Sequence, residues 1–262
     1  MISLDLTGKT ALVAGSTQGI GLASAQALAS LGAHCVLIAR NEDALKNAVN
    51  TLDGKAGRQH QYLVADFSNE EQVKQVVSDY VARNPIHILV NNTGGPPAGP
   101  IAEAKPEAFL QAFHQHLICN HLITTAVVPS MKEAGYGRIV NIISTSVKIP
   151  LKNLGVSNTV RGAVASWAKT MSNELASFGI TVNNVLPGAT ATARLEAIIS
   201  NKTVKAGVTR DEAEQEMLHE IPAGRFAQPE EIGAVVAFLA SPAAAYVNGV
   251  SIPVDGGRTG SI

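Results

Sequence analysis

The strongest constraint on the fold of this chain is a glycine-rich turn between a short apolar run and a helical stretch. Thr10–Ala14 is the apolar run, and residues 22–31 have helical periodicity and strong helix formers. In such a strand-turn-helix unit, free N–H groups and missing side chains let a pyrophosphate approach. The glycines have the spacing G-x-x-x-G-x-G, and an ordinary glycine-containing loop is the alternative interpretation. The predicted phosphate-binding residues are Gly15, Ser16, Thr17, Gln18, Gly19, Ile20 and Gly21.

Composition narrows the class of protein. A chain of 262 residues is of ordinary size for one α/β domain, and a net charge of −1 gives no electrostatic footprint for nucleic acid or an anionic membrane. No apolar run has the length of a membrane span, and the N-terminal residues do not resemble a signal peptide. Cys35 and Cys119 are expected to be buried thiols in a reducing cytoplasm, and the histidines lack metal-ligand spacing.

Strand and helix patterns alternate from end to end. The expected strands are 10–14, 34–39, 59–64, 85–91, 138–143, 180–186 and 250–254. The expected helices are 22–31, 41–52, a helix ending at 83 and capped by Ser68 or Asn69, 106–129, 155–178, two short helices within 187–224, and 229–239. Asn41 is the expected cap of the second helix, and Thr209 with Glu212 the expected capping box of a short one.

This alternation predicts an α/β fold, a doubly wound parallel sheet with helices on both faces. The chain is expected to be one domain, residues 1–262, with a substrate lid at 189–224. Ligands on such sheets bind outside the carboxyl ends of the strands. The chemistry is therefore expected in the loops that follow Ala14, Ala39, Val64, Asn91, Ile143 and Leu186.

Three of these loops indicate a dinucleotide. About 20 residues past the glycine turn, an NAD site has an acidic residue for the ribose 2′-hydroxyl. This chain has Arg40 there, whose guanidinium suits a 2′-phosphate, so NADP(H) is favoured over NAD(H), against the alternative of a solvated surface arginine. Asp66 can accept a hydrogen bond from the adenine amino group or cap the next helix. Asn92, Thr93 and Gly94 let the backbone lie against the cofactor, or form a plain turn.

Several motifs together resemble the classical short-chain dehydrogenase/reductase family, close to its 3-oxoacyl-carrier-protein reductase-like branch. They are AGSTQGIG (14–21), Asp66, NNTGG (91–95), RIVNIIS (138–144), PGATAT (187–192) and the segment 221–257. The resemblance covers essentially the whole chain. It implies a three-layer Rossmann fold with seven parallel strands, cofactor contacts at Phe67, Pro187, Gly188 and Thr192, and a dimer, often within a tetramer, through helices 106–129 and 155–178.

The chain departs from the family pattern at the positions of the family's catalytic residues. The family uses Asn, Ser, Tyr and Lys, with Tyr as proton donor and Lys lowering its pKa. Here Ser144 matches the Ser, but the Tyr position falls at Ser157 and the Lys position at Arg161. The Asn position falls at His116, or at Asn120 after a slip of one turn.

These substitutions leave an oxyanion site without the usual proton relay. Ser144, Ser157 and Arg161 can stabilise a developing oxyanion, and Arg161 can also hold the cofactor ribose. His116 is the one nearby side chain with an ordinary pKa suited to general acid work, although a buried structural histidine is the simpler interpretation. Lys148 and Lys152 are further candidates, expected to be solvated.

Three functions stay open at this point. The favoured one is an NADP(H)-dependent oxidoreductase that interconverts a carbonyl and an alcohol of a small molecule. The main alternative is a non-catalytic dinucleotide-binding protein, acting as a sensor or an oligomer partner. A third is a different reaction in the same pocket, such as dehydration.

Overall fold

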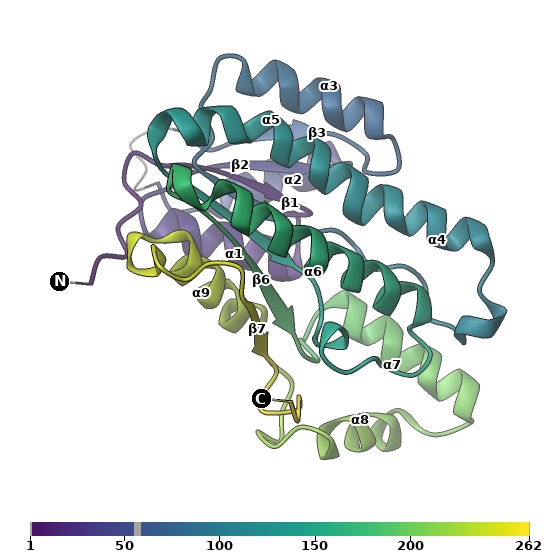
Figure 1. Ribbon diagram of the computed structural model, residues 1–262. Helices are drawn as coiled ribbons and strands as arrows, with labels where there is room; N and C mark the ends of the chain where they lie inside the picture. The colour runs from purple at the N-terminus through teal and green to yellow at the C-terminus, as the bar shows by residue number, and fades with distance from the viewer. Residues whose placement is uncertain (1, 55–58, 262) are drawn as a thin grey trace.

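The computed structural model describes residues 2–54 and 59–261, and in them one sheet of seven parallel strands. The strand order is β3-β2-β1-β4-β5-β6-β7 (Figure 1). The strands are β1 Thr10–Ala14, β2 His34–Ala39, β3 Gln61–Val64, β4 Ile88–Asn91, β5 Gly137–Ile142, β6 Ile180–Pro187 and β7 Ser251–Val254. The order reverses between β1 and β4, as in a doubly wound fold, which confirms the expected fold class.

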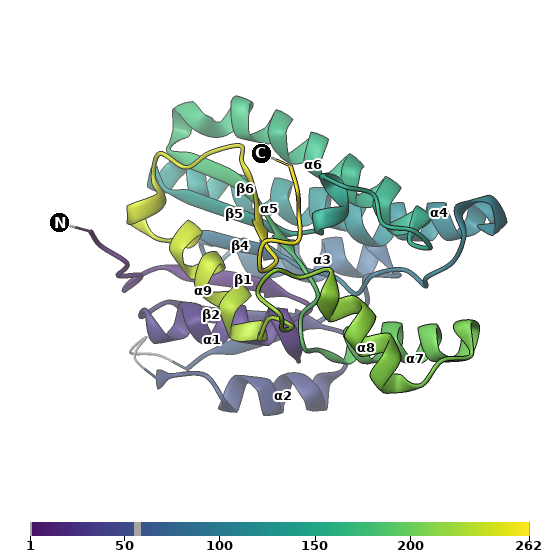
Figure 2. The ribbon, with the colours of Figure 1, turned by 90° about the horizontal axis from the view of Figure 1, so that it is seen from below.

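Helices cover both faces of the sheet, giving three layers (Figure 2). The longer ones are α1 Gly19–Ser30, α2 Glu42–Asn50, α3 Glu70–Val81, α4 Pro106–Phe113, α5 Cys119–Ala134, α6 Gly155–Leu175, α7 Ala193–Ala206, α8 Arg210–His219 and α9 Pro229–Ala240. Helices α1, α2 and α9 share a hydrophobic cluster on one face. Helices α3, α5 and α6 share a second cluster on the other face.

Alternation along each strand divides the core between the two faces. On β1, Val13 belongs to the cluster under α1 and α9, whereas its neighbour Leu12 belongs to the cluster under α5. Successive strand residues point to opposite faces, so a strand covered on both sides must be apolar throughout. This is why β1 and β2 read as continuous apolar runs in the sequence.

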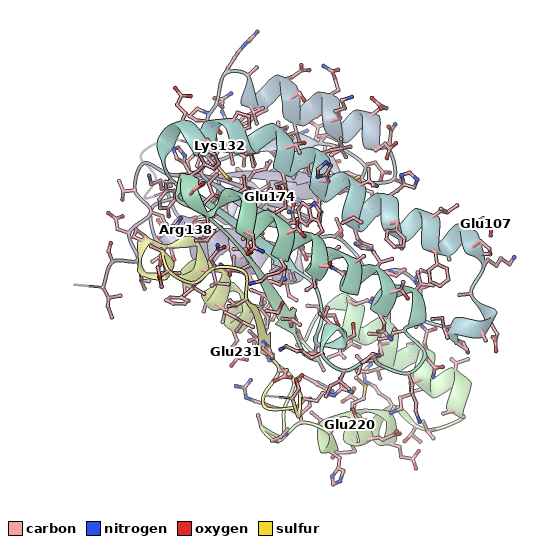
Figure 3. All side chains as sticks on the ribbon, viewed as in Figure 1. Glu107, Lys132, Arg138, Glu174, Glu220 and Glu231 are labelled. Atoms are coloured by element: carbon pink, nitrogen blue, oxygen red, sulfur yellow. The ribbon has the colours of Figure 1, made fainter. Side chains whose placement is uncertain are left out.

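The helix expected at 106–129 is longer than predicted and contains a wide turn. After α4, the π-helical turn η3 covers His114–Ile118, and α5 then continues past Pro129 to Ala134. The predicted end at Pro129 was wrong because buried Val127 and Met131 continue the apolar face beyond the proline. Figure 3 labels Glu107 near the start of this long helix and Lys132 near its end.

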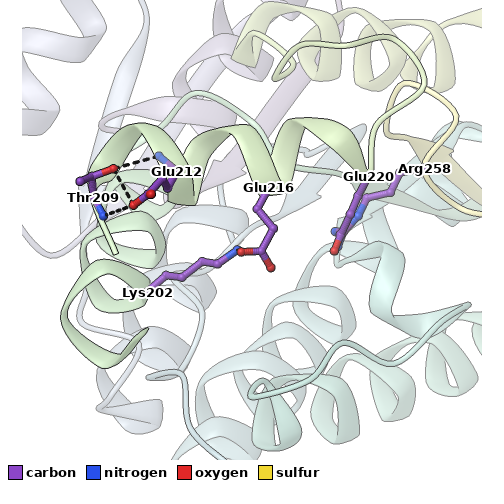
Figure 4. A network of polar contacts seen from close by, with 6 residues as sticks. All are labelled: Lys202, Thr209, Glu212, Glu216, Glu220 and Arg258. Atoms are coloured by element: carbon purple, nitrogen blue, oxygen red, sulfur yellow. Dashed lines mark hydrogen bonds and ion pairs between the residues drawn. The ribbon is translucent and has the colours of Figure 1, made fainter. Parts of the chain in front are cut away.

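The segment after β6 forms the two expected short helices, α7 and α8. The capping box is confirmed: Thr209 Oγ1 accepts from Glu212 N at 3.3 Å, and Glu212 Oε2 accepts from Thr209 N at 2.8 Å (Figure 4). Lys202 on α7 pairs with Glu216 on α8 at 2.8 Å. Their apolar contacts form a small cluster of their own, so this hairpin is packed separately from the main core. The cluster's buried members are Leu195, Ile199 and Ala213.

The predicted helix caps and free cysteines are present in the structure. Asn41 caps α2 through Ala44 N at 2.9 Å, and Asn69, rather than Ser68, caps α3 through Gln72 N. Cys35 and Cys119 are buried free thiols, as expected. Within the described ranges, no helix combines the length and apolar character needed to cross a bilayer, and no His, Cys, Asp and Glu side chains gather as a metal site.

Candidate active site

The glycine turn is held so tightly that side chains do not fit. Asn92 Nδ2 donates to Gly15 O at 3.1 Å and to Ala14 O at 3.3 Å, which ties the turn after β1 to the loop after β4. A Cβ at Gly15 would lie 2.5 Å from Asn92 O, and one at Gly21 would lie 2.2 Å from Gly15 O. Gly15 also has a positive φ of 58°. Asn92 therefore fixes the shape of the turn, a role that the sequence alone left open.

The opposite wall of this cradle comes from the loop after β6. A Cβ at Gly19 would approach Thr192 Cγ2 at 3.2 Å, and one at Gly188 would lie 2.7 Å from Asp255 Cβ. The half-buried Pro187 ends β6 directly before this loop. Gly94, in contrast, is exposed with nothing within 4 Å of where a Cβ would stand. The buried Ser16 Oγ has no hydrogen-bond partner among the described residues, so a polar group in the cradle would satisfy it. These residues fit a bound pyrophosphate.

Arg40 and Asp66 lie together in a groove of ≈ 540 Å³ at the ends of β2 and β3. Asp66 Oδ1 accepts from Ser68 N at 2.9 Å, and its contacts with Ser68 lower the pKa of the carboxyl, with a smaller effect from the charge of Arg40. Since Asn69 caps α3, the idea that Asp66 caps this helix was wrong. Phe67 packs against the core, and its carbonyl accepts from Cys119 Sγ at 3.4 Å.

A row of buried amides, which the sequence analysis missed, locks the strand ends beneath the site. Asn91 donates to Asn141 at 2.9 Å, Asn141 to Asn184 at 3.0 Å, and Asn184 to Ser251 at 3.1 Å. These four residues are register partners on β4, β5, β6 and β7. The signal was present as an asparagine in each of three successive strands. The row fixes the relative positions of the loops that carry Thr93, Ser144 and Gly188.

Arg161 lies on α6 and is 8 % exposed. Its Nη1 donates to Ile142 O at 2.7 Å and its Nη2 to Thr93 O at 3.3 Å. Burial, with a contribution from the charge of Arg194, lowers the pKa of Arg161 to about 10, still well above neutral pH. The guanidinium is therefore charged, and it is held between the ends of β4 and β5.

Ser144 and Ser157 lie on the two elements that neighbour this guanidinium, the loop after β5 and helix α6. Ser157 is half-buried on α6, one helical turn before Arg161, and residues at that spacing share a helix face. Ser144 follows β5, and its Oγ accepts from Ser146 N at 3.1 Å at the start of η4 (Thr145–Val147). Lys148 and Lys152 are exposed, as expected.

His116 is buried in the π-helical turn, 1 % exposed, with its Nδ1 hydrogen-bonded to Thr93 Oγ1. Burial, and then the charges of Arg161 and Arg194, lower its pKa from 6.5 to about 3. The imidazole is thus neutral near pH 7, which favours the interpretation of His116 as a buried structural histidine over that of a general acid. Its Nε2 has no partner among the described residues. Asn120, one turn on, is also buried, and its Oδ1 is likewise unpartnered.

Arg194, near the start of α7, is a site residue that the sequence analysis missed. Its Nη2 donates to Pro96 O at 2.7 Å, and its guanidinium lies 3.4 Å from where a Cβ of Gly95 would stand. The residue as a whole is exposed. A basic residue two positions after PGATAT was the available signal, and the fold brings it against the loop after β4.

The two tyrosines that flank the site in sequence do not reach it. Tyr136 immediately precedes β5, at the opposite end of the strand from Ser144, and its hydroxyl donates to Ala240 O at 2.6 Å. Tyr246 is exposed and precedes β7. Neither can replace the tyrosine that the family pattern would place at Ser157.

Comparisons with known proteins agree with this fold. A family model described as Enoyl-(Acyl carrier protein) reductase matches residues 14–259. The 3-oxoacyl-(acyl-carrier-protein) reductase FabG of Vibrio cholerae is 33% identical over 256 residues, which are 97% of this chain and 98% of that protein. The chain therefore belongs to the short-chain dehydrogenase/reductase family, a family of NAD(P)-dependent oxidoreductases.

Solved structures give the same result. An L-sorbose reductase from Gluconobacter frateurii, solved with NADPH and L-sorbose, has a TM-score of 0.92 and 31% identity, with 100% of both chains covered. A variant of actinorhodin polyketide ketoreductase, solved with NADPH, has a TM-score of 0.90 and 32% identity, also with 100% of both chains covered.

Proposed function

We propose that this protein is an NADP(H)-dependent oxidoreductase that interconverts a carbonyl and an alcohol on a small molecule, with Arg161 and Ser157 in place of the family's Lys and Tyr. The observation that carries the proposal is the glycine cradle. Asn92 shapes it, Gly15 and Gly21 leave no room for side chains, and the N-terminus of α1 opens onto it. Such an arrangement favours a bound pyrophosphate.

The cofactor preference rests on Arg40. It lies exposed in the groove with Asp66, where the adenosine end of a dinucleotide would follow from the cradle. A guanidinium there can bind a 2′-phosphate with charge-assisted hydrogen bonds. The two related enzymes solved with NADPH support the same choice. In this proposal Asp66 and Phe67 border the adenine, while Thr93, Gly94, Pro187, Gly188 and Thr192 border the nicotinamide half.

In the proposed mechanism the bound cofactor would supply the hydride, and side chains of the protein bind and orient the carbonyl oxygen of the substrate. Arg161, buried and charged, stabilises the negative charge that develops on the carbonyl oxygen. The hydroxyls of Ser144 and Ser157 orient that oxygen, and the proton reaches it from water through Ser157. His116 stays neutral and positions Thr93, whose carbonyl holds Arg161. Helices α7 and α8 cover the substrate as a lid.

A deuterium-transfer experiment tests this function. The protein is incubated with NADPH deuterated at the transferred position and a panel of ketones and keto acids, and products are analysed by mass spectrometry. We expect stereospecific transfer, which Arg161→Met lowers by roughly a hundredfold or more, the usual cost of losing an oxyanion donor. Ser157→Ala should lower it less, and Arg83→Met, an exposed arginine beyond the end of α3, should leave it unchanged.

The same experiment separates the proposal from its alternative. A variant that has lost transfer must still bind NADPH, which excludes misfolding as the cause. If the wild-type protein binds NADPH but transfers no deuterium above a protein-free blank, the protein is a non-catalytic dinucleotide-binding member of the family.

A further inference from the structure

The loop after β4 carries an excess of positive charge. Arg161 donates to Thr93 O from one side and Arg194 donates to Pro96 O from another. Among the described residues neither guanidinium forms an ion pair with a carboxylate within 4 Å, although other arginines of this chain do, such as Arg210 with Glu196 and Arg225 with Glu231. Both contacts of Arg161 and the contact of Arg194 are with neutral backbone carbonyls.

Two neighbouring guanidinium groups without a carboxylate partner are unfavourable unless an anion binds to them. A buried cation without a counter-charge is destabilising, and a second cation nearby adds repulsion. The repulsion is evident in the site, since the charge of Arg194 lowers the pKa of both Arg161 and His116. Arg194 is exposed, so its remaining N–H groups are accessible to a ligand.

The cofactor does not account for this charge. Its pyrophosphate is expected in the glycine cradle and its 2′-phosphate at Arg40, at the ends of β1 and β2, whereas Arg161 lies between the ends of β4 and β5. The nicotinamide ring is neutral when reduced and positive when oxidised. It therefore cannot neutralise two guanidinium groups in either state.

We propose that Arg194 binds a carboxylate of the substrate next to the carbonyl that faces Arg161, so that the substrate class is a keto acid and its hydroxy acid product. This inference rests on the proposed function and deepens it. The two arginines contact the same short loop, Thr93 to Pro96, and the charge of Arg194 acts on Arg161. We therefore infer that the oxygens they bind belong to one small ligand, as in α- and β-keto acids.

Binding to the oxidised complex tests the inference without requiring turnover. The protein saturated with NADP⁺, which cannot reduce a keto acid, is titrated by calorimetry with α- and β-keto acids of increasing size and with their methyl esters. We expect at least one acid to bind about tenfold or more tightly than its ester, the usual scale of one charged hydrogen bond. Arg194→Gln should remove this preference, and Arg194→Lys should restore part of it.

Two controls make the result decisive. Arg83→Gln, an exposed arginine beyond α3, should leave the preference intact, and NADPH affinity should be unchanged within about twofold in Arg194→Gln. The inference is overturned if no acid binds more tightly than its ester. It is also overturned if Arg194→Gln weakens NADPH and leaves the acid-to-ester ratio unchanged, because the arginine then serves the cofactor. Deuterium transfer to neutral ketones alone would uphold the proposed function while rejecting this substrate class.

Discussion

At the scale of single residues, the buried charge of Arg161 changes the chemistry of its neighbours. A guanidinium at position 161 is fixed by Ile142 O and Thr93 O and remains charged. Burial, and then the charge of Arg161, lower the pKa of His116 and keep its imidazole neutral. The site therefore offers a fixed positive charge and neutral hydroxyls, which suits oxyanion stabilisation better than proton donation by a side chain.

The low pKa of His116 predicts a pH-dependent stability. An unfolded histidine binds a proton below its ordinary pKa of 6.5, whereas folded His116 does so only near 3. The unfolded state thus binds more protons in this window, and stability falls as the pH drops through it. Urea unfolding should show wild-type stability falling by up to about 1.4 kcal/mol per pH unit more steeply than that of His116→Gln.

A matched control uses another histidine. His219→Gln, exposed at the end of α8, should keep the wild-type slope. Parallel stability curves for wild type and His116→Gln would mean that folded His116 binds its proton near the ordinary pKa of 6.5, and the account of a pKa lowered by burial would fail.

At the scale of elements, two irregular pieces shape the pocket. The π-helical turn η3 places His116 against Thr93 within a helix that otherwise packs on the sheet. The hairpin of α7 and α8 extends beyond the strand ends, and it is joined to the body by Arg194 with Pro96 and by Glu220 with Arg258 (Figures 1 and 4). Because its apolar cluster is small and separate, its stability depends on such polar contacts.

The capping box gives a prediction for this hairpin. Thr209→Ala removes the N-cap of α8 and should cost about 1 kcal/mol, which speeds hydrogen exchange of α8 amides roughly fivefold. Mass-resolved hydrogen exchange measures this change. Thr125→Ala, on the exposed side of α5, should leave α8 unaffected. Unchanged exchange in Thr209→Ala would show that α8 does not depend on its cap.

At the scale of the whole molecule, the sequence predicted the architecture because periodicity, caps and glycines act locally. The alternating elements, the glycine turn and the Asn41 and Thr209 caps are confirmed. The π-helical turn was missed because α4 and α5 have one continuous helical pattern, and its extra residue leaves no local signature. The end at Pro129 was missed because buried packing outweighed a helix-breaking residue.

The candidate site was only partly predictable, because some of its contacts join segments that are far apart in the sequence. Residues at strand ends could be placed from the topology rule, and Arg40 with Asp66 do share a groove. The contacts of Arg194 and the row from Asn91 to Ser251 depend on which distant segments meet. The pKa of His116 depends on burial and on two charges far away in sequence, so its ordinary value was a poor guide.

Direct cofactor binding tests the central claim, that the cradle holds NADP(H). Purified protein and Arg40→Ala are titrated with NADPH and NADH, and the cofactor fluorescence is followed. We predict micromolar NADPH binding, weaker NADH binding, and a loss of roughly tenfold to a hundredfold in NADPH affinity in Arg40→Ala with NADH unaffected. Binding of neither cofactor would contradict the account, and the glycine turn would then be a structural element of an interaction protein.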